Sequence, residues 1–436
     1  MTFKKKNLQK DDLKKLVIFI FLLFSLFSPH LNILGVNVKT VYFFIVMPAF
    51  LGVLIILKNM KLLKAEFYFL LAILVALFFS TLISWMAYAV DIGQIVATVR
   101  GIILFFCSYF FAHIYKRIYR ENFFDVLLLH ILYAVIVNSI VILLLFLIPD
   151  IKPIWHNIVL LSDTQTDQAM RNDMFVRLSG LVHSGFGALS VVNAVGFVIV
   201  LYLYLYSPNK TISLSKFIFY AAILFVTTVL VGRLGLVIML MSVGLVILSI
   251  NSKRLLLKYL KMLILLIIIM ILIGIAFYVN FEERFIFGFL TIFNLFLQGE
   301  LDPSTSTVLA EKFAHDLSFK DWLIGTGDYS LETIDRDSGY IRLISGGGIL
   351  GFMIIYFFMI IPVVFVVKKA LPYGLLVLLI AFPVIILVVN IKNVFYFQYN
   401  DIFQIYILVV VGVFKLDLMK SIYIPTANSN YRKLDS

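Results

Sequence analysis

Long apolar runs, separated by short polar segments, recur along the whole chain. Twelve of these runs approach the length of about 20 residues that a helix needs to cross a bilayer. They cover residues 16–34, 38–57, 67–90, 94–114, 125–148, 180–206, 217–232, 234–250, 262–280, 341–367, 372–389 and 402–414. The pattern predicts an all-α, polytopic integral membrane protein, with about twelve transmembrane helices in a single domain over residues 1–436.

The composition agrees with this prediction. The chain is 62% hydrophobic and 14% charged, whereas soluble domains are about half apolar and about a quarter charged. An excess of this size excludes an ordinary cytosolic, secreted or disordered protein. The single cysteine, Cys107, also excludes a disulfide framework and a cysteine-based metal site.

The net charge of +12 would suggest a nucleic-acid partner in a soluble protein. Here topology explains most of it, because an even number of spans puts both termini on one side of the membrane. The segments on that side hold 24 of the 36 basic residues, 20 of them lysines. The positive-inside rule therefore predicts that both termini are cytoplasmic, and no nucleic-acid partner is required.

Two of the predicted outer loops, residues 149–179 and 282–340, are long enough to fold. In the longer loop, Asp302 and Pro303 are suited to the N-cap and first position of a helix. Val308, Leu309, Phe313 and Leu317 then form an apolar stripe. We expect an amphipathic helix that packs on the outer face of the membrane.

The basic residues outside the cytoplasmic segments are mainly arginines, seven of twelve. The rigid donor fork of arginine matches phosphate and carboxylate oxygens two at a time. Arg100, Arg177, Arg233 and Arg342 all fall near the predicted outer boundary, and no Asp or Glu is expected inside a span to neutralise them. Each arginine alone could extend to the interface or pair with a loop carboxylate. The four together favour a shared anionic ligand, and bare spans argue against a proton- or cation-coupled transporter.

Glycines and histidines leave more than one interpretation open. Gly346, Gly347, Gly348 and Gly351 suit close helix packing, or a helix start whose free amides face an anion. His183 and His315 could be polar interface residues or bases. His315 shares a helix face with Glu311, but no third ligand stands at helical spacing, so no metal site is predicted.

Three segments together resemble the bacterial superfamily of O-antigen polymerases and O-antigen ligases. They are Arg177-Leu178-Ser179-Gly180-Leu181, Val231-Gly232-Arg233-Leu234-Gly235-Leu236, and the region that contains Gly325-Thr326-Gly327-Asp328, Asp337-Ser338-Gly339-Tyr340-Ile341-Arg342 and Gly347-Gly348-Ile349-Leu350-Gly351. Ligases tend to carry a His-Asn pair just before the segment equivalent to Tyr340-Ile341, where this chain has Asp337-Ser338. The resemblance therefore favours the O-antigen polymerase family.

The resemblance implies an enzyme of the bacterial inner membrane that polymerises lipid-linked oligosaccharide repeat units at its periplasmic face. The expected substrate is an oligosaccharide on undecaprenyl diphosphate, and a polysaccharide chain-length regulator is the expected protein partner. No cofactor or metal is required, because the sugar–diphosphate bond already holds the energy.

Roles for individual residues follow from this reaction. Arg177, Arg233, Arg100 and Arg342 would bind the diphosphate. Asp337 would be the base, with His315 or His183 in reserve, although Asp337 could instead pair with Arg336 or Arg342. Trp322, Tyr329, Tyr340 and Trp155 would offer stacking faces to the glycan. Two alternatives stay open: a ligase that transfers glycan to a lipid A core, and a flippase for lipid-linked sugars.

Overall fold

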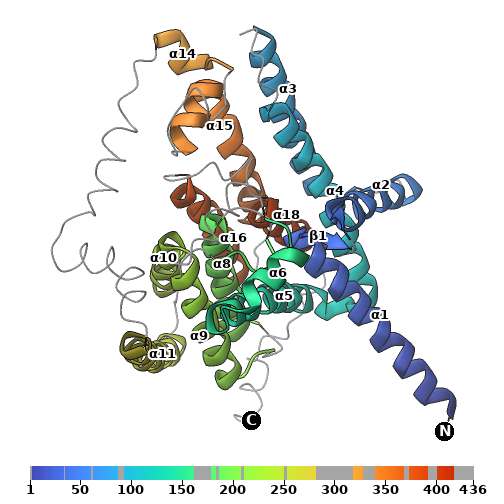
Figure 1. Cartoon of the computed structure of the whole chain (residues 1–436). Helices are drawn as coiled ribbons and strands as arrows, with labels where there is room; N and C mark the ends of the chain where they lie inside the picture. The colour runs from blue at the N-terminus through green and yellow to red at the C-terminus, as the bar shows by residue number, and fades with distance from the viewer. Residues whose placement is uncertain are drawn as a thin grey trace, which may run out of the picture.

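The computed structural model of the chain describes residues 2–33, 35–59, 62–86, 93–161, 178–182, 186–207, 211–249, 253–280, 318–327, 339–367, 373–390 and 400–416. Most of them are helical (Figure 1). The α-helices are α1 Thr2–Phe27, α2 Met47–Asn59, α3 Lys64–Met86, α4 Gly93–Tyr119, α5 Phe123–Leu147, α6 Ile151–Ile158, α8 Phe186–Leu205, α9 Leu214–Val231, α10 Arg233–Ser249, α11 Lys253–Asn280, α14 Phe319–Ile324, α15 Gly339–Val367, α16 Tyr373–Val389 and α18 Asn400–Phe414. A π-helical turn, η1 Tyr42–Val46, precedes α2, and a 3₁₀ turn, η2 Arg120–Asn122, joins α4 to α5.

Five helical segments among the described residues are long and apolar enough to cross a membrane. They are Lys64–Ile83, Thr98–Leu147 (which covers most of α4, all of η2 and α5), Ala188–Leu205, Leu214–Val231 and Gly339–Pro362. Shorter apolar helices accompany them at Tyr42–Lys58, Leu234–Ile247, Tyr259–Ile268, Val377–Val389 and Asp401–Phe414. The protein is thus an all-α membrane protein in its main architecture, while twelve spans and the orientation remain predictions.

The first apolar run differs from the expected span 16–34. Helix α1 ends at Phe27, because Pro29 cannot continue a helix and the residue before it is pushed out of helical geometry. The chain then forms a small antiparallel hairpin of β1 His30–Ile33 and β2 Val36–Lys39, in which His30 pairs with Lys39. The backbone N–H of Leu160 donates to the carbonyl of His30 at 2.8 Å, so the hairpin is held next to the end of α6.

Basic residues gather where α3 begins and where α4 and α18 end, and we call this the lysine end (Lys64, Lys116 and Lys415). Lys415 forms an ion pair of 3.0 Å with Glu66, and Lys116 donates to the carbonyl of Lys415 at 2.8 Å. Burial lowers the pKa of Lys415, and the carboxylate of Glu66 opposes this shift. The helices that meet here come from opposite halves of the sequence.

Three carboxylates are buried in the first turns of apolar helices: Glu66, Asp125 and Asp401. Asp125 lies inside the expected span 125–148, contrary to the expectation that the spans contain no carboxylate, whereas Glu66 and Asp401 lie one residue before the expected spans 67–90 and 402–414. Glu66 is fully buried in the first turn of α3, where Lys415 neutralises it. Asp125 is buried in the first turn of α5 and accepts a hydrogen bond of 2.7 Å from Ser207. All three lie at helix starts, next to the boundary of an apolar run, where the average hydrophobicity of the run does not reveal a single carboxylate.

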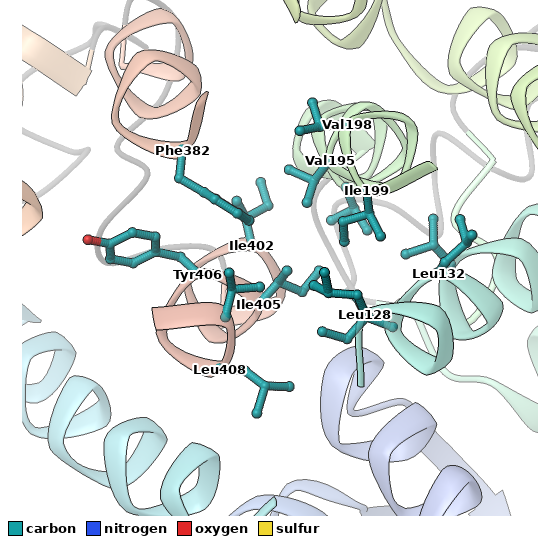
Figure 2. Close-up of a cluster of buried hydrophobic side chains, with 14 of the residues drawn as sticks. Leu128, Leu132, Val195, Val198, Ile199, Phe382, Ile402, Ile405, Tyr406 and Leu408 are labelled. Carbon is teal, nitrogen blue, oxygen red and sulfur yellow. The ribbon is translucent and has the colours of Figure 1, made fainter. Parts of the chain in front are cut away.

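The centre of the bundle is α18. Its residues from Ile402 to Val413 are almost completely buried. Figure 2 shows Ile402 and Ile405 of α18 between Leu128 of α5, Val195 and Ile199 of α8, and Phe382 of α16. A helix that is apolar all round belongs in the interior of a bundle, as α18 does here.

Candidate functional site

The opposite end of the bundle, where α10 begins at Arg233 and α15 begins at Gly339, is called the arginine end below. Its first component is the segment 318–327, which docks on α15 (Figure 1). Ser318 caps α14, since its hydroxyl accepts from the backbone N–H of Asp321 at 3.2 Å. Beyond α14, the backbone N–H groups of Thr326 and Gly327 donate to the carbonyls of Ser345 and Gly346 at 2.7 and 2.9 Å.

Glycine makes this docking possible on both sides of the contact. Helix α15 is broken at Gly348, which has φ +63° and ψ −175°. A Cβ on Gly348 would collide with the carbonyl of Leu323, and a Cβ on Gly325 (φ +89°) would lie 2.6 Å from the backbone N of Gly348. The backbones therefore touch without intervening side chains. Close packing, one of the two roles expected for the glycine cluster, is the one that the structure shows for Gly348.

The first turn of α15 carries two of the predicted site residues. Arg342 is only 3% exposed. Tyr340 is half-buried, and its hydroxyl donates to the carbonyl of Leu387 on α16 at 2.6 Å. Its backbone N–H donates to the carbonyl of Asn390 at 3.1 Å, and the side-chain amide of Asn390 donates to the hydroxyl of Tyr356 at 2.6 Å. These bonds fix the start of α15 against the end of α16.

Trp322 differs from Tyr340 in its exposure. Its side chain on α14 is 42% exposed, whereas the hydroxyl of Tyr340 is already used inside the protein. Of the two, Trp322 has the surface needed to stack on a sugar. The segment that contains Trp322 contacts α15 at Ser345, Gly346 and Gly348, three to six residues beyond Arg342.

The second component is the segment Leu178–Val182, which follows Arg177 in the sequence. The side-chain carbonyl of Asn138 on α5 accepts from the backbone N–H of Leu181 at 2.7 Å. The indole N–H of Trp155 on α6 donates to the carbonyl of Gly180 at 2.9 Å. Gly180 has φ +60°, and a Cβ there would collide with Asn138, so glycine is needed for this contact. Trp155 is thus a structural anchor of the loop.

A buried polar network lies beneath this segment. Ser139 on α5, Asn193 on α8 and Thr227 on α9 are connected by hydrogen bonds of 3.2 to 3.4 Å. Four residues beyond Thr227, α9 ends at Val231, and after Gly232 helix α10 begins at Arg233. The network therefore ties the segment after Arg177 to the turn that carries Arg233.

The start of α10 is held against α8. The hydroxyl of Ser190 accepts from the backbone N–H of Gly235 at 3.2 Å, and a Cβ on Gly235 would collide with the carbonyl of Ser190. Further along, α10 packs against α16, whose end contacts the start of α15. Arg233 and Arg342 consequently stand in the first turns of two helices that both pack against α16.

The remaining predicted residues are placed as follows. Arg100 is exposed on α4, which packs against α2, α3, α5 and α18, and the contacts among the described residues do not place it beside Arg342. The side chain of Arg233 lies outside the described part of the structure. So do five predicted residues entirely, together with the predicted helix at 302–317: Arg177, His183, His315, Tyr329 and Asp337. Within the described ranges, no group of three His, Cys, Asp or Glu residues could hold a metal ion.

Two asparagines contribute to this end of the bundle that the sequence analysis did not single out, Asn138 and Asn390. Asn138 orders the segment after Arg177, and Asn390 joins α16 to α15. Each stands within or directly after an apolar run, where a polar side chain is costly and usually has a specific role. That isolation is the signal by which they could have been found.

Comparison with protein-family models finds no family that matches this chain, and comparison with curated proteins finds no similar sequence. The residues themselves therefore carry the functional argument.

Proposed function

We propose that the protein polymerises lipid-linked oligosaccharide repeat units, such as those of O-antigen, by glycosyl transfer from undecaprenyl diphosphate. The reaction would take place at the arginine end, on the periplasmic face of the bacterial inner membrane. A membrane glycosyltransferase of this kind needs cations for a diphosphate, a surface for sugars and an apolar body in the bilayer.

One observation carries the proposal. The three segments that resemble O-antigen polymerases are up to 170 residues apart in the sequence, yet contacts through α5, α8 and α16 connect their described parts. Leu181 is bonded to α5, Gly235 to α8, and Gly327 to α15. A resemblance in sequence alone does not require that the three segments be connected in the fold. A shared binding site for one substrate does require it.

Arg342 suits an anionic ligand in particular. It lies in the first turn of α15, where the helix dipole is positive, and it is almost fully buried. The positive end of the helix dipole favours an anion beside it. The bidentate fork of Arg342 fits the oxygens of a diphosphate.

The proposed reaction forms one glycosidic bond and breaks one sugar–phosphate bond. A hydroxyl oxygen at the non-reducing end of one repeat unit attacks the anomeric carbon of the growing chain. The bond between that carbon and the phosphate oxygen breaks, and undecaprenyl diphosphate leaves with the electron pair. Arg342, Arg233, Arg177 and Arg100 would stabilise the charge on the leaving diphosphate. Asp337, or else His315 or His183, would accept the proton of the attacking hydroxyl.

Reconstitution of the purified protein with lipid-linked repeat units tests the proposal. We expect Arg342→Lys to lower the rate of polymer formation by about 10²–10³-fold, the usual effect of removing one preorganised donor. Arg117→Lys, the same change at an exposed arginine of α4 near the lysine end, is the matched control and should be fully active. Equal activity of Arg342→Lys and the control would contradict the diphosphate role.

A deletion strain distinguishes the proposal from its alternatives. Loss of the long glycan ladder with a single-repeat band retained supports a polymerase. Loss of all glycan attachment would instead indicate a ligase, and accumulation of lipid-linked units on the inner leaflet would indicate a flippase. Either of these results would refute polymerisation.

A further inference from the structure

Helices α3 and α15 enclose an apolar groove that none of the residues discussed above uses. Its volume is about 660 Å³. Nine of its ten lining residues are aliphatic, Met or Phe, and the tenth is Tyr68. The groove runs between the first half of α3, with Tyr68, Ala72 and Val75, and the second half of α15, with Met353, Phe357 and Val364.

The groove has a closed end and an open side. Towards the arginine end the two helices come together at Gly351 of α15 and Phe79 of α3. Because glycine has no side chain, the Phe79 ring lies only 3.2 Å from the place that a Cβ on Gly351 would occupy. Beyond that contact, the groove is lined by larger side chains of α15, among them Met353 and Phe357. Met353 and Phe357 are 62% and 65% exposed, so the groove opens outward. Both helices are long and apolar enough to cross a membrane, so an apolar groove between them suits the acyl chain of a lipid.

A cation lies at the other end of the groove. The ammonium group of Lys64 is 5.9 Å from the centroid of the Tyr68 ring, and the Lys64 side chain is exposed. An occupant with an acyl chain in the groove would place its head group beside Lys64. Basic residues at such positions between membrane helices favour anionic lipids.

We propose that this groove binds one anionic phospholipid, with its phosphate at Lys64 and an acyl chain running towards Gly351. This phospholipid and the lipid-linked substrate of the proposed function would bind at different places on the protein. The substrate diphosphate belongs at the arginine end, and the Gly351–Phe79 contact closes the groove on that side. The inference therefore does not depend on the proposed function.

Native mass spectrometry of the purified full-length chain tests the proposal, after reconstitution with equal amounts of phosphatidylglycerol and phosphatidylcholine that carry the same acyl chains. We expect one phosphatidylglycerol to be retained. Ala72→Phe fills the groove and should lower the retained lipid at least tenfold. Ala222→Phe, on α9 away from the groove, is the matched control and should retain it.

Charge is tested separately. Lys64→Gln should abolish the preference for phosphatidylglycerol over phosphatidylcholine, whereas Lys58→Gln, an exposed lysine at the end of α2, should not. Equal lipid retention by Ala72→Phe and Ala222→Phe would overturn the site. Displacement of phosphatidylglycerol by undecaprenyl phosphate at equal concentration would overturn the choice of occupant.

Discussion

The substitution Gly348→Ala should separate the segment 318–327 from α15. Gly348 is the point at which the helix breaks, with φ +63° and ψ −175°. A methyl group at this position would meet the backbone of the docked segment, including the backbone N of Ile324 at 2.5 Å. Backbone atoms cannot rotate away as the end of a long side chain can. The two chains must therefore move apart, or the break must change its geometry.

The magnitude follows from two contributions. A residue with a side chain in this glycine-only region of backbone space costs on the order of 1–3 kcal/mol. Separation also removes the hydrogen bonds from Thr326 and Gly327 to α15, each worth about 0.5–1.5 kcal/mol. We therefore expect the docked arrangement to lose about 2–6 kcal/mol.

Hydrogen exchange of the backbone amides of Thr326 and Gly327 measures this loss. A change of about 2 kcal/mol corresponds to a decrease of about 30-fold in protection, which is the smallest effect that we expect. Gly244→Ala is the matched control, because a Cβ on Gly244 in α10 meets nothing within 4 Å. It should leave the protection unchanged. If Gly348→Ala also left it unchanged, the docking of 318–327 through glycine contacts would be refuted.

Two further predictions concern buried polar groups. Glu66→Gln leaves the buried ammonium of Lys415 without its counter-ion and should destabilise the protein by about 3–5 kcal/mol. The double variant Glu66→Gln, Lys415→Met should recover part of this loss, measured as the midpoint temperature of thermal aggregation. A midpoint no higher than that of Glu66→Gln alone would argue against the ion pair. Asn138→Ala removes the acceptor of the Leu181 N–H and should cost about 1–3 kcal/mol. A red shift of Trp155 emission would report the loosened segment, and unchanged emission and stability would count against the anchor.

The sequence predicted the parts of the fold that depend on long-range averages. Apolar runs locate the helices well, since a helix in a bilayer must be apolar over most of its length. Features that depend on single residues within or beside an apolar run were not predicted. Pro29 ends α1 early and a hairpin follows, and Glu66 and Asp125 are buried in the first turns of their helices. Such features depend on partners elsewhere in the chain, which a window on one run does not contain.

The candidate site was predictable to a similar degree. Charge and glycine content pointed to the start of α15, and the structure places Arg342 there as a buried residue next to a docked loop. Exposure could not be read from the sequence: Arg342 and Arg100 look alike as isolated arginines, yet one is buried and the other exposed. The hydrogen bond from the hydroxyl of Tyr340 to α16 was likewise not predictable from the sequence, and its role in stacking on a glycan stays a prediction.

The central position of α18 has a consequence for biosynthesis. Helices α1, α3, α4, α5 and α8 all pack on α18, which follows them in the sequence. Roughly 280 residues separate the end of α4 from the start of α18, and at about 5–20 residues per second a ribosome needs roughly 15–60 s to add them. During that time the early helices are in the membrane without the element that fills the space between them. They must remain loosely associated, or be kept from false contacts by the insertion machinery, until α18 arrives and completes the bundle.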